Sequence, residues 1–184
     1  MTPLLRPLLA AFCLLLPAAP LVRAAPDSAN APKVRLVFVD WEKFTDIVVD
    51  GVSTKSGADM VWGELNRHLA SLARRSLAPG ETLVITMRDI DLAGVVEPWR
   101  GPDFGHVRYI RDTAPPRLVF DYQVLDAGGA VLKEGSERLT DLAFRFQQPP
   151  IGRSDSVYYE KQLLSDWMRK AFTAPKKPGR RKGD

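Results

Sequence analysis

The chain has 184 residues, with 26 Lys or Arg, 22 Asp or Glu and a formal net charge of +4. The positive charge gathers at the two ends. Arg6 and Arg23 lie within residues 1–24, and residues 176–184 carry five basic side chains and one acidic side chain. The residues between these ends have a net charge of −2, so the pI of about 9.3 does not indicate a basic groove for nucleic acid. We expect no specific nucleic-acid partner.

Residues 1–24 have the pattern of a secretory signal peptide. Arg6 precedes an apolar run over residues 8–16, and Pro17 and small residues lead to a cleavage site after Ala24. The run is shorter than the roughly 20 apolar residues that a membrane span needs. We therefore expect a periplasmic or secreted protein with no transmembrane segment in the mature chain. The alternative is an uncleaved N-terminal anchor.

The rest of the chain is predicted to form one domain. Its length suffices to bury a core without disulfides, and the only cysteine, Cys13, leaves with the signal peptide. Residues 25–33 are rich in Pro, Ala and Ser and predict a flexible spacer before a single domain over residues 34–173. Residues 174–184 predict a disordered basic tail, which we expect to make at most weak contacts with anionic surfaces.

The first half of the domain predicts a strand and then a helix. Residues 34–39 form a β-rich apolar run. Residues 57–77 predict a helix that begins with a capping box formed by Ser56 and Asp59 and ends before Pro79-Gly80. Apolar residues recur on one face of this helix at spacings of three and four: Val61, Leu65, Leu69 and Leu72.

A second strand is predicted over residues 82–87, where apolar side chains alternate. If the alternation continued unchanged, Asp89 and Asp91 would enter the core, where unpaired carboxylates are costly. The strand therefore either ends near Arg88 or contains a bulge that turns both carboxylates outward.

The second half predicts a loop, a hairpin and a helix. Residues 97–105 predict a loop, and residues 106–111 a short strand. A clear strand over residues 117–125 leads through a glycine turn at 126–129 to a polar edge strand over residues 130–139.

The last predicted element is a helix over residues 157–172. It carries an apolar stripe: Tyr159, Leu163, Leu164, Trp167, Met168 and Ala171. Since each strand and each helix has one apolar face, the sequence predicts an α+β two-layer sandwich. Its mainly antiparallel sheet would have about four to five strands, with both long helices packed on one face.

Three segments resemble one bacterial protein family. Residues 38–46 (FVDWEKFTD), 88–94 (RDIDLAG) and 159–167 (YEKQLLSDW) resemble, in the same order, the family catalogued as domain of unknown function 3016 (DUF3016). The resemblance spans residues 34–172 and implies an exported bacterial protein. It implies no catalytic residues, because none is assigned for the family.

The sequence lacks the motifs of several enzyme classes. It has no Gly-x-Ser-x-Gly elbow and neither of the glycine-rich phosphate-binding motifs. Its two histidines, His68 and His106, make neither a catalytic triad nor a zinc site, which needs three or four nitrogen or sulfur ligands. We predict no catalytic residue, no metal site and no cofactor, and interpret His68 as a surface or half-buried residue.

Four carboxylates form the first candidate binding surface. Asp40 and Asp46 follow the first predicted strand, and Asp89 and Asp91 follow the second. If the two strand ends adjoin, these side chains would lie close together, in a loose cation site or as a pair for general acid-base chemistry. The alternative is solvated carboxylates that cap backbone amides in turns.

A loop rich in Pro and Gly forms the second candidate surface. It carries Trp99, Arg100, Phe104 and His106, and Trp and Arg are frequent at binding hot spots. The alternative is that both aromatic rings cover one end of the sheet.

These observations predict an uncharacterised exported protein that acts by binding a protein or small molecule in the cell envelope, without catalysis. The alternative is a carboxylate- or metal-dependent hydrolase that uses the Asp89/Asp91 turn.

Overall fold

The computed structural model describes residues 31–49, 54–105, 107–147, 149 and 155–172. The predicted signal peptide, most of the spacer, the basic tail and His106 lie outside the described residues. None of the described helices has the length and apolarity needed to cross a membrane.

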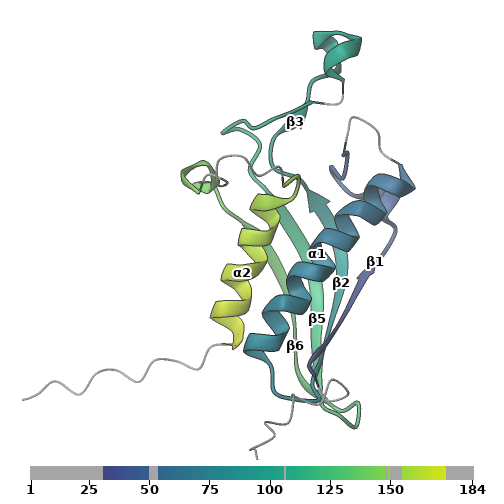
Figure 1. Cartoon of the computed structure of the whole chain (residues 1–184), viewed down its shortest axis with the longest axis vertical. Helices are drawn as coiled ribbons and strands as arrows, with labels where there is room; N and C mark the ends of the chain where they lie inside the picture. Colours follow the sequence, from purple (N-terminus) through teal and green to yellow (C-terminus); the bar gives the residue numbers. More distant parts are fainter. Residues whose placement is uncertain (1–30, 50–53, 106, 148, 150–154, 173–184) are drawn as a thin grey trace, which may run out of the picture.

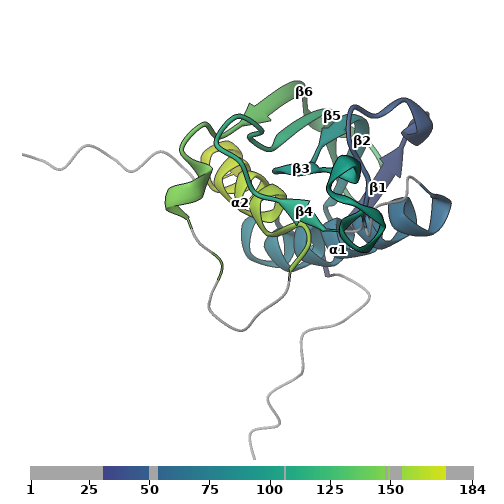
Figure 2. The same cartoon turned by 90° about the horizontal axis from the view of Figure 1, so that it is seen from above.

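The predicted α+β sandwich is confirmed: two helices, α1 (Lys55–Ser76) and α2 (Tyr158–Phe172), cover one face of a four-stranded sheet (Figures 1 and 2). The strands lie in the order β1 (Lys33–Phe38), β2 (Thr82–Asp91), β5 (Arg117–Leu125) and β6 (Val131–Thr140). β1 and β2 are parallel, as expected for strands joined through a helix, and the other neighbours are antiparallel.

The short strand predicted over residues 106–111 belongs to a separate two-stranded sheet. This sheet pairs β3 (Val95–Val96) with β4 (Arg108–Tyr109). Two single-turn helices, η3 (Pro98–Arg100) and η4 (Pro102–Phe104), lie between these strands. We call β3, η3, η4 and β4 together the arm, which extends from one end of the main sheet (Figure 1). Two further single turns are η2 (Trp41–Lys43) and η5 (Phe144–Phe146).

The start of α1 differs from the predicted capping box. Thr54 is the N-cap, and its hydroxyl accepts a hydrogen bond from the Gly57 amide at 3.2 Å. Ser56 lies within the helix, and the Asp59 carboxylate is paired with the Lys55 ammonium at 2.7 Å. The helix thus begins two residues earlier than predicted, because Thr54 supplies the same capping chemistry one step before Lys55.

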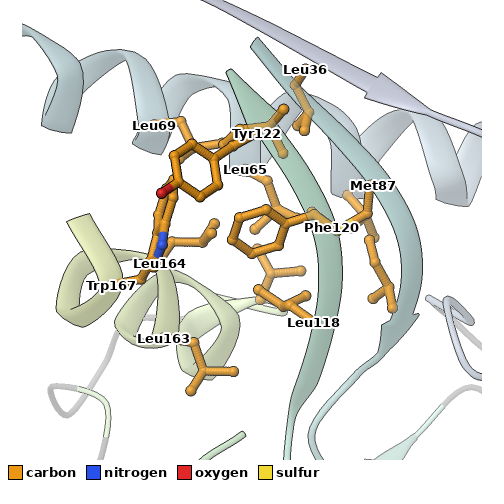
Figure 3. Close-up of a cluster of buried hydrophobic side chains, with 14 of the residues drawn as sticks. Leu36, Leu65, Leu69, Met87, Leu118, Phe120, Tyr122, Leu163, Leu164 and Trp167 are labelled. Carbon is orange, nitrogen blue, oxygen red and sulfur yellow. The ribbon is translucent and has the colours of Figure 1, made fainter. Parts of the chain in front are cut away.

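The core lies between the helices and the inner face of the sheet (Figure 3). Trp167 of α2 packs edge-on against Phe120 and Tyr122 of β5, with ring centroids 4.9 and 5.1 Å apart. The predicted stripe of α1 is buried throughout: Val61, Leu65, Leu69 and Leu72. This packing sets both helices on the same face.

The bulge alternative is correct for β2. The pairing register with β5 shifts between Met87 and Asp89, after which Ile90 is fully buried. Asp89 and Asp91 therefore lie on the opposite face, and Asp91 stands directly opposite Arg117 of β5.

Candidate functional site

The ends of the first two strand regions adjoin, which was the condition for the first candidate surface, and they bring three of the four candidate carboxylates together. The Asp46 amide donates to the Ile90 carbonyl at 2.9 Å, and Asp46 bridges Asp91 in parallel. The Thr45 amide donates to Asp89 Oδ1 at 2.7 Å and its hydroxyl to Asp89 Oδ2 at 2.9 Å. We call Asp46, Asp89 and Asp91, with Arg108 and Arg117, the strand-end cluster.

Asp40 lies apart from the strand-end cluster. It adopts a left-handed conformation (φ 53°) before η2. Its exposed carboxylate accepts a hydrogen bond from Lys43 at 2.8 Å, which lowers its pKa. The left-handed conformation of Asp40 turns the chain away from β2, and the chain lies beside β2 again at Asp46. This turn separates the two carboxylates.

Arg108 of the arm holds Asp46 with both of its terminal nitrogens. Its two Nη atoms lie 2.9 Å from the two Asp46 carboxylate oxygens. The same guanidinium donates to the carbonyls of Gly94 at 2.9 Å and of Val48 at 2.7 Å. Because the Arg108 side chain is only 16% exposed, this fork joins the arm to the end of the sheet through charge-assisted hydrogen bonds.

Arg117 contacts the other two carboxylates. Its Nη2 lies 3.3 Å from both Asp89 Oδ2 and Asp91 Oδ2 and donates to the Thr45 hydroxyl at 3.1 Å. Within the described residues, its buried Nε has no hydrogen-bond partner. Burial raises the pKa of the Asp91 carboxyl, although Arg117 opposes the shift.

Glu160 adds a carboxyl group that sequence reasoning missed. It lies in the first turn of α2, is 1% exposed, and accepts a hydrogen bond from the Ala93 amide at 2.7 Å. Burial raises its pKa to about 7, against the hydrogen bond from Ala93. The contact joins the start of α2 to the segment between β2 and the arm.

The sequence held one signal for Glu160 and none for Arg108. Glu160, Leu164 and Met168 follow one another at spacings of four, so Glu160 falls on the apolar row of its helix. A charged side chain in an apolar row is expected to be buried and therefore to have a hydrogen-bond or ion-pair partner in the interior. Arg108, in contrast, lies in a short polar segment without periodicity.

The strand-end cluster borders a hollow of about 360 Å³, lined by Asp46, Asp91, Gly94, Val95, Thr113, Ala114, Pro115, Arg117 and Thr140. Its carboxylates are already paired with guanidinium groups. Within the described part of the chain, no three carboxylate, histidine or cysteine side chains are grouped so that they could hold a metal ion. The cluster's visible role is to hold the strand ends and the arm together.

The base of the arm is fixed by one buried carboxylate. Glu97 is 5% exposed; it pairs with Arg100 and with Arg111, whose Nη2 lies 2.7 Å away. The Arg100 guanidinium also lies 4.5 Å from the centre of the Tyr109 ring. Hydrogen bonding from Arg100, and then from Arg111, lowers the pKa of Glu97.

Gly94 permits the chain to enter the arm. It has a φ of +80°, and a Cβ there would lie 2.4 Å from the backbone oxygen of Tyr109. Only glycine accepts both this conformation and this close approach. Together with the Glu97 pairs, it gives the arm a defined direction.

The tip of the arm exposes two aromatic side chains, Trp99 at 77% and Phe104 at 48%. The alternative, that both rings cover one end of the sheet, is therefore wrong. Other large apolar side chains are exposed beside the arm or after β6, which ends at the same end of the sheet: Ile110, Leu142 and Phe146. Arg145 pairs with Asp112 at 2.6 Å and so ties the η5 turn to the segment after the arm.

His68 is half-buried between the two helices, as interpreted from the sequence. Its Nε2 lies 2.8 Å from the Ser165 hydroxyl and 3.0 Å from the Lys161 carbonyl. Ser165 also donates to that carbonyl at 2.8 Å. These contacts join α1 to α2, and burial lowers the pKa of the His68 imidazole.

The solved structures that this chain is similar to include two forms of one assembly. A variant of the PelC dodecamer from Paraburkholderia phytofirmans, in space group C2, is 12% identical over 79% of this chain and 89% of that chain, with a TM-score of 0.37. The PelC dodecamer in space group P6 is 13% identical over 74% and 84%, with a TM-score of 0.35. Likeness at this level supports no conclusion about partners or assembly.

The comparison with family models is more informative. No curated protein matches the sequence. The model described as "Protein of unknown function (DUF3016)" matches residues 32–170, which run from β1 into the last turn of α2. This confirms the resemblance carried by the three sequence segments, and the chain belongs to the DUF3016 family.

Proposed function

We propose that this protein is exported by its N-terminal segment and acts in the cell envelope as a binding protein without catalytic activity. The tip of the arm is the contact surface, and a protein of the envelope is the partner. The single observation that carries the proposal is the 77% exposure of Trp99 on an arm whose base is fixed.

The chemistry of the tip supports a protein partner. Trp and Arg are enriched among the residues that dominate binding energy, and Trp99 is adjacent to Arg100. The fixed base reduces the ordering cost of association, because the arm does not have to be organised when the partner binds. The neighbouring exposed apolar side chains would extend the contact.

The hydrolase that uses Asp89 and Asp91 is the less favoured alternative. Arg117 contacts both carboxylates, and a general base or a metal ligand would first have to leave that guanidinium. For Asp91, Arg117 also opposes the rise in pKa that burial causes.

Site-specific photocrosslinking in the natural host tests the proposal. A photoreactive amino acid at Trp99 is expected to give one dominant adduct with an envelope protein, because the side chain would be buried in the complex. The same amino acid at Ala127, an exposed residue of the hairpin turn, is the matched control. A Trp99 adduct pattern that does not differ from the Ala127 pattern would contradict the proposed surface.

A further inference from the structure

The two edges of the main sheet differ in how they are protected. β1 has six residues, and the Trp62 indole of α1 donates to its Leu36 carbonyl at 2.7 Å. β6 has ten residues and is the other edge. Within the described residues, no group outside the sheet is hydrogen-bonded to the backbone of β6. A long unpaired edge of this kind is a template for another strand.

The helix-facing side of β6 carries opposite charges on either side of a glycine. Lys133, Gly135 and Glu137 stand opposite Val124, Tyr122 and Phe120 of β5. A Cβ at Gly135 would lie 2.9 Å from Tyr122 Cε1, so the glycine lets the tyrosine ring lean across β6. The centre of the edge is therefore aromatic and has a charge on each side.

A groove of about 710 Å³ runs between this side of β6 and α2. Its lining includes Lys133, Glu137, Tyr122 and Trp167. The Trp167 indole nitrogen is buried and, within the described part of the chain, has no hydrogen-bond partner. One residue of the groove wall therefore carries a buried polar atom that the described residues leave without a partner.

We propose that β6 pairs antiparallel with β6 of a second copy of this chain, with Gly135 facing Gly135 across the two-fold axis. In this register Lys133 of each copy stands opposite Glu137 of the other, which gives two equivalent ion pairs. The two four-stranded sheets become one continuous sheet with all helices on the same face. Such a symmetric contact is self-complementary and closed.

Face and charge select this register over its neighbours. A shift by one residue in either direction brings the helix-facing residues of one copy opposite the open-face residues of the other. In one direction it also places Lys133 opposite Arg138 and Glu134 opposite Glu137, and like charges directly opposite each other are destabilising. A shift by two residues in one direction places Glu134 of the two copies opposite each other. In the other direction it pairs Glu134 with Arg138 on the open face but leaves Lys133 and Glu137 unmatched. We choose the register that pairs Lys133 with Glu137 because both line the groove, where a pair is less screened by water.

Charge reversal tests the pairing through the mass of the full chain, measured by sedimentation velocity over a range of concentrations. The unaltered protein is expected to be a dimer. Lys133→Glu and Glu137→Lys should each weaken the dimer by about tenfold or more, because each places like charges opposite one another twice. The double variant Lys133→Glu/Glu137→Lys should restore it.

Recovery of the dimer in the double variant would show that the single variants lost the contact between copies and not the fold of each chain. Lys133 also donates to the Ala171 carbonyl at 2.7 Å within its own chain, so loss in the single variant alone would not suffice. Glu134→Arg is the matched control on the open face and should leave the dimer intact. A monomer at every concentration, or a double variant no better than the singles, would overturn the proposal. Sensitivity to Glu134→Arg but not to Lys133→Glu would overturn the register.

Discussion

The strand-end cluster and the tip of the arm lie at the same end of the sheet but differ in how far their side chains are satisfied within the chain. In the cluster, Asp46, Asp89 and Asp91 all contact a guanidinium group. At the tip, Trp99 and Phe104 leave much of their apolar surface in water. The comparison teaches that charged side chains gathered at a strand end can serve to hold the fold together, while the contact surface that we propose is apolar.

Removing the central guanidinium of the cluster should have the largest effect on stability. Arg108→Ala would leave Asp46, which is 22% exposed in its side chain, without its bidentate partner and several carbonyls without a donor. The cost is expected to be about 3 kcal/mol of unfolding free energy, measured by chemical denaturation. This loss is expected if the ion pairs of the cluster hold the fold together. It is not expected if Asp46 is an unpaired carboxylate kept for a reaction.

An exposed ion pair on the open face of the sheet is the matched control for Arg108. Arg88 pairs with Asp121 at 2.8 Å, and their side chains are 52% and 42% exposed. Arg88→Ala should cost less than about 1 kcal/mol. Equal losses for Arg88→Ala and Arg108→Ala would remove the distinction between the cluster and the ordinary surface.

The next effect is a pH dependence set by Glu160. Its pKa is about 7 in the folded chain against an ordinary value of 4.5, so the folded state binds more protons than the unfolded state between these values. The stability that the protonated carboxyl provides is present below about pH 4.5 and is lost as the pH rises to about 7. The loss is at most about 3 kcal/mol. Thermal melting of the unaltered protein and of Glu160→Gln measures it, and the variant should lack this slope.

The difference between the two proteins is the quantity to compare, because other groups titrate nearby. Burial lowers the pKa of His68, which makes stability rise with pH below its ordinary value of 6.5. Burial raises the pKa of Asp91 and acts in the same direction as Glu160. Both contributions remain in Glu160→Gln and cancel in the difference. If the two pH profiles run parallel, Glu160 is not a protonated buried group.

The sequence predicted the elements better than their connections. Alternation in β5 and spacing in α1 depend on local burial, so both were recognisable. The proximity of Asp46 and Asp91 was only a conditional expectation, because the sequence did not show which strands are neighbours in the sheet. The Thr54 cap was missed because Ser56 offers the same chemistry two residues later.

The site was less predictable, because its partners are far apart in the chain. Arg108 and Asp46 are separated by 62 residues, and Glu160 and Ala93 by 67. No periodicity encodes which buried carboxylate meets which donor. The exposure of Trp99 was equally hidden, since a Pro/Gly-rich loop with aromatic residues can cover a core or project from it.

The smallest effect on stability is expected at the tip of the arm. A small effect there would distinguish the tip most clearly from the strand-end cluster. Trp99 is 77% exposed, so Trp99→Ala should change the unfolding free energy by no more than about 0.5 kcal/mol, as measured by the same denaturation experiment. The same Trp99→Ala variant can carry a photoreactive residue in place of Phe104. If this protein loses the envelope adduct while its stability is unchanged, the tip of the arm carries binding and the strand-end cluster carries stability. A stability loss comparable to that of Arg108→Ala would mean instead that the tryptophan packs against the sheet in solution, and the arm would then be a cover for the core.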